Sequence, residues 1–94
     1  MEKIEAKHII VKGRVQGVGF RYYTRSIGNR LGLKGVVRNL MNGDVEIYVA
    51  GEKDKLEKFI QLIKKGPPLS YVVEVKINDI SPDTVEYTNF TIGF

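Results

Sequence analysis

The chain has 94 residues, enough for one small domain, and its 43% hydrophobic and 28% charged residues are typical of a globular protein. It contains no cysteine, which excludes disulfides, thiolate nucleophiles and cysteine-ligated metal centres. The single histidine, His8, argues against a histidine-rich metal site or a catalytic triad. The net charge of +4 is compatible with an anionic partner but too small to indicate nucleic acid.

The chain shows no sign of a membrane segment or an export signal. Its wholly apolar runs are only a few residues long, and residues 1–5 lack the basic region and apolar stretch of a signal peptide. We therefore expect a cytoplasmic protein without a membrane partner. No repeat, low-complexity segment or linker divides residues 1–94, so we expect a single domain.

A strand and a helix are predicted in the first third of the chain. Residues 8–12 are β-rich and end at Gly13, as in a short strand. After a glycine-rich loop, apolar side chains recur at helical spacing over residues 20–31. Gly28 lies inside this pattern and costs about 1 kcal/mol relative to alanine, so the helix depends on packing.

A hairpin and a second helix follow. Residues 35–40 and 45–49 are β-rich, and Asn42-Gly43 between them is a strong hairpin signal, with both turn residues required to accept a positive φ. Residues 52–65 place apolar side chains on one helix face, with acidic residues early and lysines late, as the helix dipole favours.

The remainder of the chain predicts one strand and an optional second. Val73, Val75 and Ile77 alternate with polar residues, as in a strand with one buried face, and residues 87–94 are a final β-rich run. The resulting order is the ferredoxin-like βαββαβ plan, an α+β sandwich in which two helices cover one face of an antiparallel sheet. We expect this fold, with an optional short extra strand at the C-terminus.

The glycine-rich loop is the candidate functional motif. It reads Gly13-Arg14-Val15-Gln16-Gly17-Val18-Gly19 and leads into a predicted helix start. Glycine accepts a positive φ, so successive N–H groups can converge on one point, and a helix N-terminus adds unpaired N–H groups. Arg21, in the first turn, supplies a planar set of donors that suits a tetrahedral oxyanion. The motif predicts an anion cradle, best suited to phosphate.

The loop matches no nucleotide-binding motif. It lacks the Gly-Lys-Ser/Thr of a P-loop, and Phe20-Arg21 follows where the dinucleotide fingerprint would continue. The residues alone leave one alternative open, in which the glycines only shape a tight crossing and Arg21 pairs with a surface carboxylate.

Few side chains could act together with such a cradle. His8 lies within a strand, Ser26 lies inside the helix, and no pair of carboxylates flanks the loop. Asn39 ends the second strand on the same face as Val37, and its amide can orient a water but cannot act as a strong base. A strand-end asparagine also commonly caps its own turn. Such a site suits an activated phosphate whose leaving group departs without protonation, such as the carboxylate of a mixed anhydride.

Three segments carry a resemblance to a known family. They are the string G-x-V-Q-G-V-x-F-R over residues 13–21, Gly35-Val36-Val37-Arg38-Asn39-Leu40 followed by Asn42-Gly43, and Gly66-Pro67-Pro68. Together they closely resemble the acylphosphatase family over essentially the whole chain, and the first string is highly specific.

The resemblance implies a ferredoxin-like fold and hydrolysis of acyl phosphates to a carboxylate and inorganic phosphate, without a metal or other cofactor. Asn39 would position the attacking water, and a phosphate oxygen of the substrate would accept its proton. Inorganic phosphate would be both product and inhibitor, and we expect a monomer. By motif, the phosphate would be bound by Arg21 and by the backbone of Arg14, Val15, Gln16, Gly17, Val18 and Gly19.

Some positions depart from the family pattern. Animal members tend to carry an aromatic residue where Gly19 stands and a hydroxyl residue where Leu40 stands, and many relatives have tryptophan in place of Val36. The chain therefore resembles the microbial branch. Its length favours a stand-alone member over the larger carbamoyl-transfer maturation proteins that carry a similar domain.

Two other functions compete with hydrolysis. A nucleic-acid-binding domain would use the positive charge and stacking by Tyr22, Tyr23, Tyr48 and Tyr71, but paired aromatics on central strands are not readable, and we expect no nucleic-acid partner. A non-catalytic sensor would bind phosphate in the same cradle. Asn39→Ala separates the hydrolase from the sensor, because an enzyme would lose turnover whereas a sensor would keep its ligand.

Overall fold

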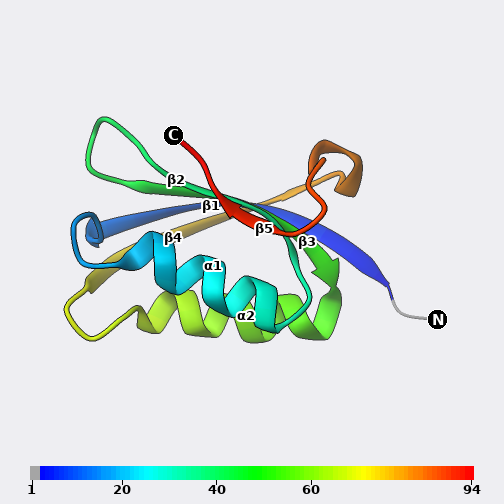
Figure 1. The fold of residues 1–94 in the computed structure, drawn as a ribbon, viewed down its shortest axis with the longest axis horizontal. Helices are drawn as coiled ribbons and strands as arrows, with labels where there is room; N and C mark the ends of the chain where they lie inside the picture. The colour runs from blue at the N-terminus through cyan, green and yellow to red at the C-terminus, as the bar shows by residue number, and fades with distance from the viewer. Residues whose placement is uncertain (1–2) are drawn as a thin grey trace.

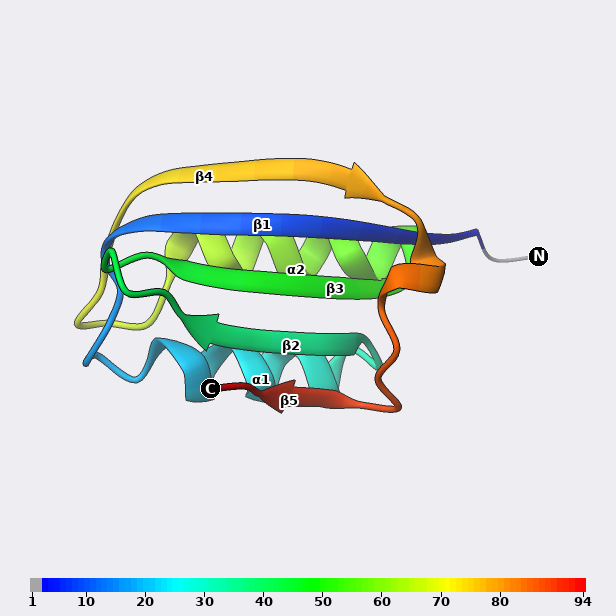
Figure 2. The same cartoon turned by 90° about the horizontal axis from the view of Figure 1, so that it is seen from above.

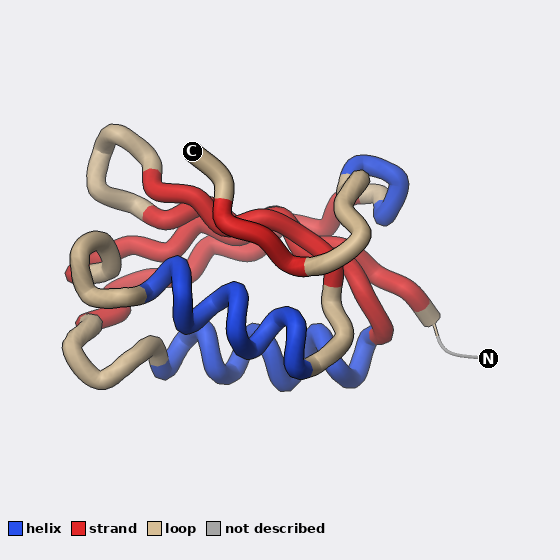
Figure 3. Tube along the Cα trace, in the orientation of Figure 1, coloured by secondary structure: helices blue, strands red, loops and turns tan. Residues whose placement is uncertain are grey.

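The computed structural model describes residues 3–94 as two layers, a sheet and a pair of helices (Figure 1). Both α-helices lie side by side on one face of the sheet, and Figure 3 shows the loops gathered at the two ends. In chain order the elements are β1 (Ile4–Arg14), α1 (Phe20–Arg30), β2 (Lys34–Asn39), β3 (Val45–Glu52), α2 (Lys53–Lys65), β4 (Tyr71–Ile80), the 3₁₀ helix η1 (Pro82–Thr84) and β5 (Phe90–Ile92).

The sheet has the strand order β4-β1-β3-β2-β5 (Figure 2). β1 pairs antiparallel with both β3 and β4, and β2 pairs antiparallel with β3. This arrangement confirms the predicted ferredoxin-like α+β sandwich. The optional C-terminal strand is present as β5, which pairs parallel with β2, so the five-stranded sheet is mixed. No helix in the described part of the chain is long and apolar enough to cross a bilayer.

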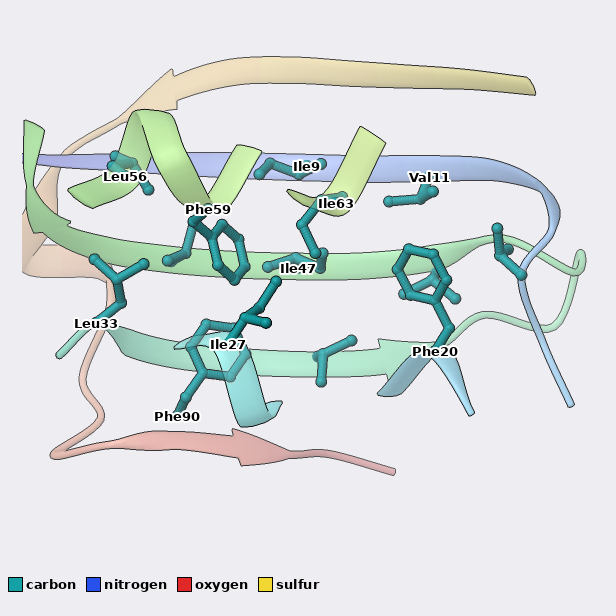
Figure 4. Close-up of a cluster of buried hydrophobic side chains, with 14 residues drawn as sticks. Ile9, Val11, Phe20, Ile27, Leu33, Ile47, Leu56, Phe59, Ile63 and Phe90 are labelled. Atoms are coloured by element: carbon teal, nitrogen blue, oxygen red, sulfur yellow. The ribbon is translucent and has the colours of Figure 1, made fainter. Parts of the chain in front are cut away.

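The core lies between the sheet and the helices (Figure 4). Alternate residues of β1 and β3 face the helices, because strand side chains point to opposite faces in turn. Ile9 and Ile47, which are paired across these strands, are both fully buried. The Phe59 ring from α2 and the Phe90 ring from β5 lie 5.5 Å apart, so the last strand closes the core above α1.

Gly28 in α1 is explained by this packing. A Cβ atom at Gly28 would lie 2.4 Å from Cδ2 of Phe90, a ring that is only 2% exposed. The helix therefore gives up about 1 kcal/mol of intrinsic propensity at this position and gains close contact with β5.

The burial pattern of β4 differs from the prediction that Val73, Val75 and Ile77 share one buried face. The pairing of β1 with β4 shifts register between Lys12 and Gly13, so Val72 and Val75 pack on the core whereas Val73 is 68% exposed. A bulge of this kind reverses the alternation of side chains beyond it. Gly13 has φ 129°, and a Cβ there would meet the Tyr71 carbonyl at 2.1 Å.

The hairpin between β2 and β3 is a longer turn than the Asn42-Gly43 signal predicts. Among the described non-glycine residues none has a positive φ, so Gly43, at φ 96°, is the one residue of this turn with a positive φ. The loop over residues 40–44 is closed by a hydrogen bond from Leu40 N–H to the Asp44 carbonyl at 2.8 Å. Asn42 Oδ1 accepts from the Asp44 N–H at 3.0 Å, which makes Asn42 the capping residue of the turn.

Candidate active site

The conformation of the loop between β1 and α1 depends on two glycines and one buried side chain. Val15 is 1% exposed and anchors the loop in the core. Gly17 and Gly19 have φ values of 72° and 78°, and nothing lies within 4 Å of the place where a Cβ would stand on either. The backbone conformation, and not the available space, is therefore the reason for glycine at these positions.

Gly19 is also the N-cap of α1, and no side chain there bonds the first N–H groups of the helix. Those donors have no partner within the helix, because an α-helix leaves its first four N–H groups unpaired. The first turn contains no acidic residue either. The N-terminus of α1 thus offers free donors and a partial positive charge, which favour an anion.

A pocket of about 150 Å³ lies at this helix end. This volume is many times the roughly 10–15 Å³ that one water occupies by the same measure. The loop, the first turn of α1 and the end of β2 all contribute to it, through Val15, Gly17, Gly19, Phe20, Arg21, Tyr22 and Asn39. The β1–α1 loop and the β2–β3 loop lie at the same end of the sheet (Figure 2), which is how these distant segments meet.

Five of the residues named by the sequence therefore meet in one pocket: Val15, Gly17, Gly19, Arg21 and Asn39. Arg14, Gln16 and Val18 do not line it, and the role predicted for their backbone N–H groups stays a prediction. Sequence reasoning missed Phe20 and Tyr22 as lining residues. Their positions on either side of Arg21, in the first turn, were the available signal.

Arg21 makes no ion pair within the described residues. No carboxylate of residues 3–94 therefore supports the alternative in which Arg21 pairs with a surface carboxylate. A guanidinium group beside free helix N–H groups gathers positive charge on one side of the pocket, and both kinds of donor suit a tetrahedral oxyanion.

Asn39 provides a different kind of group. It lies opposite Val45 at the end of β2, on the helix-facing side that it shares with Val37. Its Oδ1 atom is buried and has no hydrogen-bond partner among the described residues. Because an unpaired buried carbonyl oxygen is costly, nearly all such atoms in proteins are satisfied. An exception beside a pocket marks an acceptor that is available to a water or a ligand.

The side chain of Gln16 connects the two loops that form the pocket. Its Nε2 atom donates to the carbonyl of Leu40 at 2.7 Å and to the carbonyl of Asp44 at 2.8 Å. The carboxylate of Asp44 accepts in turn from Lys12 Nζ at 2.6 Å, and this hydrogen bond raises the pKa of the lysine. The β2–β3 loop is thus held to the β1–α1 loop by direct bonds next to Asn39.

Other side chains that could take part in proton transfer or nucleophilic attack lie outside the pocket. His8 is on the opposite face of the sheet, with Nε2 2.9 Å from Glu46 Oε2 and its ring 4.6 Å from that of Tyr48. Ser26 is exposed and does not line the pocket. Tyr23 packs between the helices, where its hydroxyl donates to the Leu62 carbonyl at 2.6 Å and burial raises its pKa. Residues 3–94 contain no group of three or more His, Cys, Asp or Glu side chains that could hold a metal ion.

The fold and the pocket define an α+β protein that can hold a tetrahedral oxyanion at a helix N-terminus, beside an amide oxygen that can accept a hydrogen bond from water. A family model for acylphosphatase matches residues 7–92. The chain is 47% identical over 91 residues to an acylphosphatase of Archaeoglobus fulgidus, covering 95% of this chain and 98% of the relative. The chain belongs to the acylphosphatase family, which hydrolyses acyl phosphates.

Solved structures agree with this assignment. The crystal structure of acylphosphatase from Bacillus subtilis matches with a TM-score of 0.90 and 35% identity, covering 98% of this chain and 100% of that one. Full-length HypF, solved in its phosphate- and nucleotide-bound form, matches with a TM-score of 0.87 and 34% identity. That match covers 100% of this chain but only 12% of HypF, so the likeness concerns one part of the larger protein.

Proposed function

We propose that this protein hydrolyses acyl phosphates in the pocket at the N-terminus of α1, with phosphate bound by the loop and Arg21 and with the attacking water oriented by Asn39. The observation that carries the proposal is the buried Oδ1 of Asn39, in the same pocket as Arg21, with neither group paired to any residue of the described range 3–94. Arg21 supplies charge, and Asn39 supplies an acceptor for a water proton.

The reaction follows from what these groups can do. The water oxygen forms a bond to phosphorus while the bond between phosphorus and the acyl oxygen breaks, and the electron pair leaves with the carboxylate. One proton of the water passes to a phosphate oxygen, so the products are a carboxylate and dihydrogen phosphate. The N–H groups and the guanidinium stabilise charge on the phosphoryl oxygens in a loose transition state.

No general acid is needed in this scheme, because a carboxylate is a good leaving group without protonation. Because no general acid is required, a pocket that is lined by neither a histidine nor a carboxylate can still be catalytic. We further propose that no metal or cofactor takes part. The single-domain organisation, the monomeric state and the cytoplasmic location stay predictions of the sequence.

Turnover of benzoyl phosphate tests the proposal, measured in EDTA with and without inorganic phosphate as a competitor. We expect chelator-resistant hydrolysis that phosphate inhibits. Asn39→Ala should lower kcat by at least about 100-fold with phosphate inhibition retained. Arg21→Met should lose about 2–4 kcal/mol of transition-state stabilisation. Asn78→Ala on β4 and Arg30→Met at the far end of α1 are matched controls outside the pocket.

Each result has a distinct meaning. Unchanged turnover in Asn39→Ala would remove the water-positioning role, and unchanged turnover in Arg21→Met would remove the phosphate site. If the native protein binds phosphate but hydrolyses no acyl phosphate, it is a phosphate sensor. If EDTA abolishes turnover and added divalent metal restores it, the metal-free mechanism is wrong.

A further inference from the structure

A second pocket adjoins the one just described and has no role in the scheme above. It has a volume of about 270 Å³ and lies between α1 and the C-terminal segment that includes β5. Arg21 and Tyr22 line both pockets, so the two lie next to each other at these residues. The second pocket is completed by Arg25, Thr91, Ile92 and Phe94.

Arg25 gives this pocket its charge. Its guanidinium carbon lies 5.2 Å from the centre of the Tyr22 ring, which is the geometry of a cation–π contact. No carboxylate side chain of the described residues makes an ion pair with Arg25 or Arg21. Both cations are therefore available to an anion that enters from solvent.

The placement of these arginines opposes the stability of the helix. Arg21 and Arg25 are four residues apart on α1, so their side chains lie on one face, one turn from each other. Like charges at this spacing destabilise a helix by about 0.2–0.5 kcal/mol, and a cation in the first turn also opposes the helix dipole. No acidic residue of the first turn compensates. Local conflicts of this kind are expected where a sequence serves a ligand.

We propose that the second pocket binds the acyl group of the substrate and selects acyl phosphates that carry a second anionic group, such as a distal carboxylate. This inference rests on the proposed function. With the phosphoryl group at Arg21, the acyl carbon points past Tyr22 toward Arg25. The aromatic ring and Ile92 contact the carbon skeleton, and the Arg25 guanidinium pairs with the distal anion.

Two synthetic substrates of nearly equal shape test the inference: 4-carboxybenzoyl phosphate, which carries the distal anion, and its neutral amide analogue, 4-carbamoylbenzoyl phosphate. The measured quantity is the ratio of their kcat/KM values, carboxylate over amide. We expect Arg25→Met to lower this ratio about three- to tenfold, as for one partly exposed ion pair. Arg25→Lys should keep most of the ratio, because the charge is retained.

Arg30→Met is the matched control, since Arg30 is an exposed arginine of the same helix and lines neither pocket. It should leave the ratio unchanged. The effect of Arg25→Met should also shrink as salt is raised, because exposed charges are screened. An unchanged ratio in Arg25→Met would overturn the subsite while leaving the proposed function standing. If the native protein hydrolyses benzoyl phosphate but neither of these two substrates, the subsite is overturned and the proposed function stands. If it hydrolyses none of the three, both are overturned.

Discussion

Gln16 Nε2 lies 2.7 Å from the main-chain oxygen of Leu40, so the β1–α1 loop is hydrogen-bonded to the residue that directly follows Asn39. The second bond of the same nitrogen, to the Asp44 carbonyl, closes the far side of the β2–β3 loop. Catalysis by positioning tolerates little displacement of the groups that hold phosphate and water. We therefore predict that the Gln16 side chain positions the two loops for catalysis, although it does not line the pocket.

Replacing Gln16 by leucine should lower kcat about ten- to hundredfold, because misplacement near 1 Å has effects of this size. Stability should fall by about 1–2 kcal/mol through the loss of two part-buried hydrogen bonds. Steady-state kinetics and urea unfolding measure the two effects. Asn29→Ala is the matched control, since the Asn29 amide also bonds two backbone groups, both of Phe90, but far from the pocket. Equal kcat losses in the two variants would show that Gln16 acts through stability alone.

Gly28→Ala should destabilise the protein, although helix propensity by itself favours alanine by about 1 kcal/mol. The added Cβ would stand 2.4 Å from the buried Phe90 ring and force β5 away from α1. We expect a net loss of about 1–3 kcal/mol, the usual range for overpacking. Chemical unfolding gives the sign directly, and a more stable variant would mean that Phe90 can move without cost.

Gly19→Ala should cost about 1–2 kcal/mol through its left-handed backbone alone, because nothing lies near the new Cβ. Gly19→Asn should cost less, since asparagine adopts this conformation more readily. Gly13→Ala should be worse than either, because its Cβ would meet the Tyr71 carbonyl and separate β1 from β4. Unfolding free energies of the three variants test this order, and equal losses would contradict it.

Tyr23→Phe removes the hydrogen bond to the Leu62 carbonyl and should cost about 1 kcal/mol at neutral pH. Burial raises the pKa of Tyr23, so the folded state keeps this phenol protonated to higher pH than the unfolded state. Its contribution is complete below the unfolded pKa of about 10 and is lost as pH rises through the folded value. Between about pH 9 and 12, stability should fall less steeply in Tyr23→Phe than in the native protein. Unfolding free energies can be measured by urea unfolding across this pH range. If they fall with pH at the same slope in both proteins, the linkage is refuted.

Local sequence patterns were enough to predict the helices and the turn before α1, whereas the details of strand pairing were not predictable from them. The period of apolar residues gives α1 and α2, and the glycines at 17 and 19 predict a turn with positive φ before a helix. Simple alternation predicts Val73 on the buried face, because alternation by itself contains no bulge, and the bulge depends on how β4 pairs with β1. The parallel direction of β5 likewise depends on its partner β2, which lies far away in the sequence.

The candidate site also has features set by the local sequence and features set only by the tertiary structure. The residue types, the loop and the free helix end were determined by the sequence itself, since backbone conformation and donor chemistry are properties of a short segment. Only the tertiary structure decided that Arg21 has no carboxylate partner within residues 3–94, that the buried Asn39 Oδ1 lies in the same pocket, and that Gln16 ties their two loops together. These relations join segments about twenty residues apart in the chain, and strand pairing and burial, which are properties of the whole molecule, bring them together.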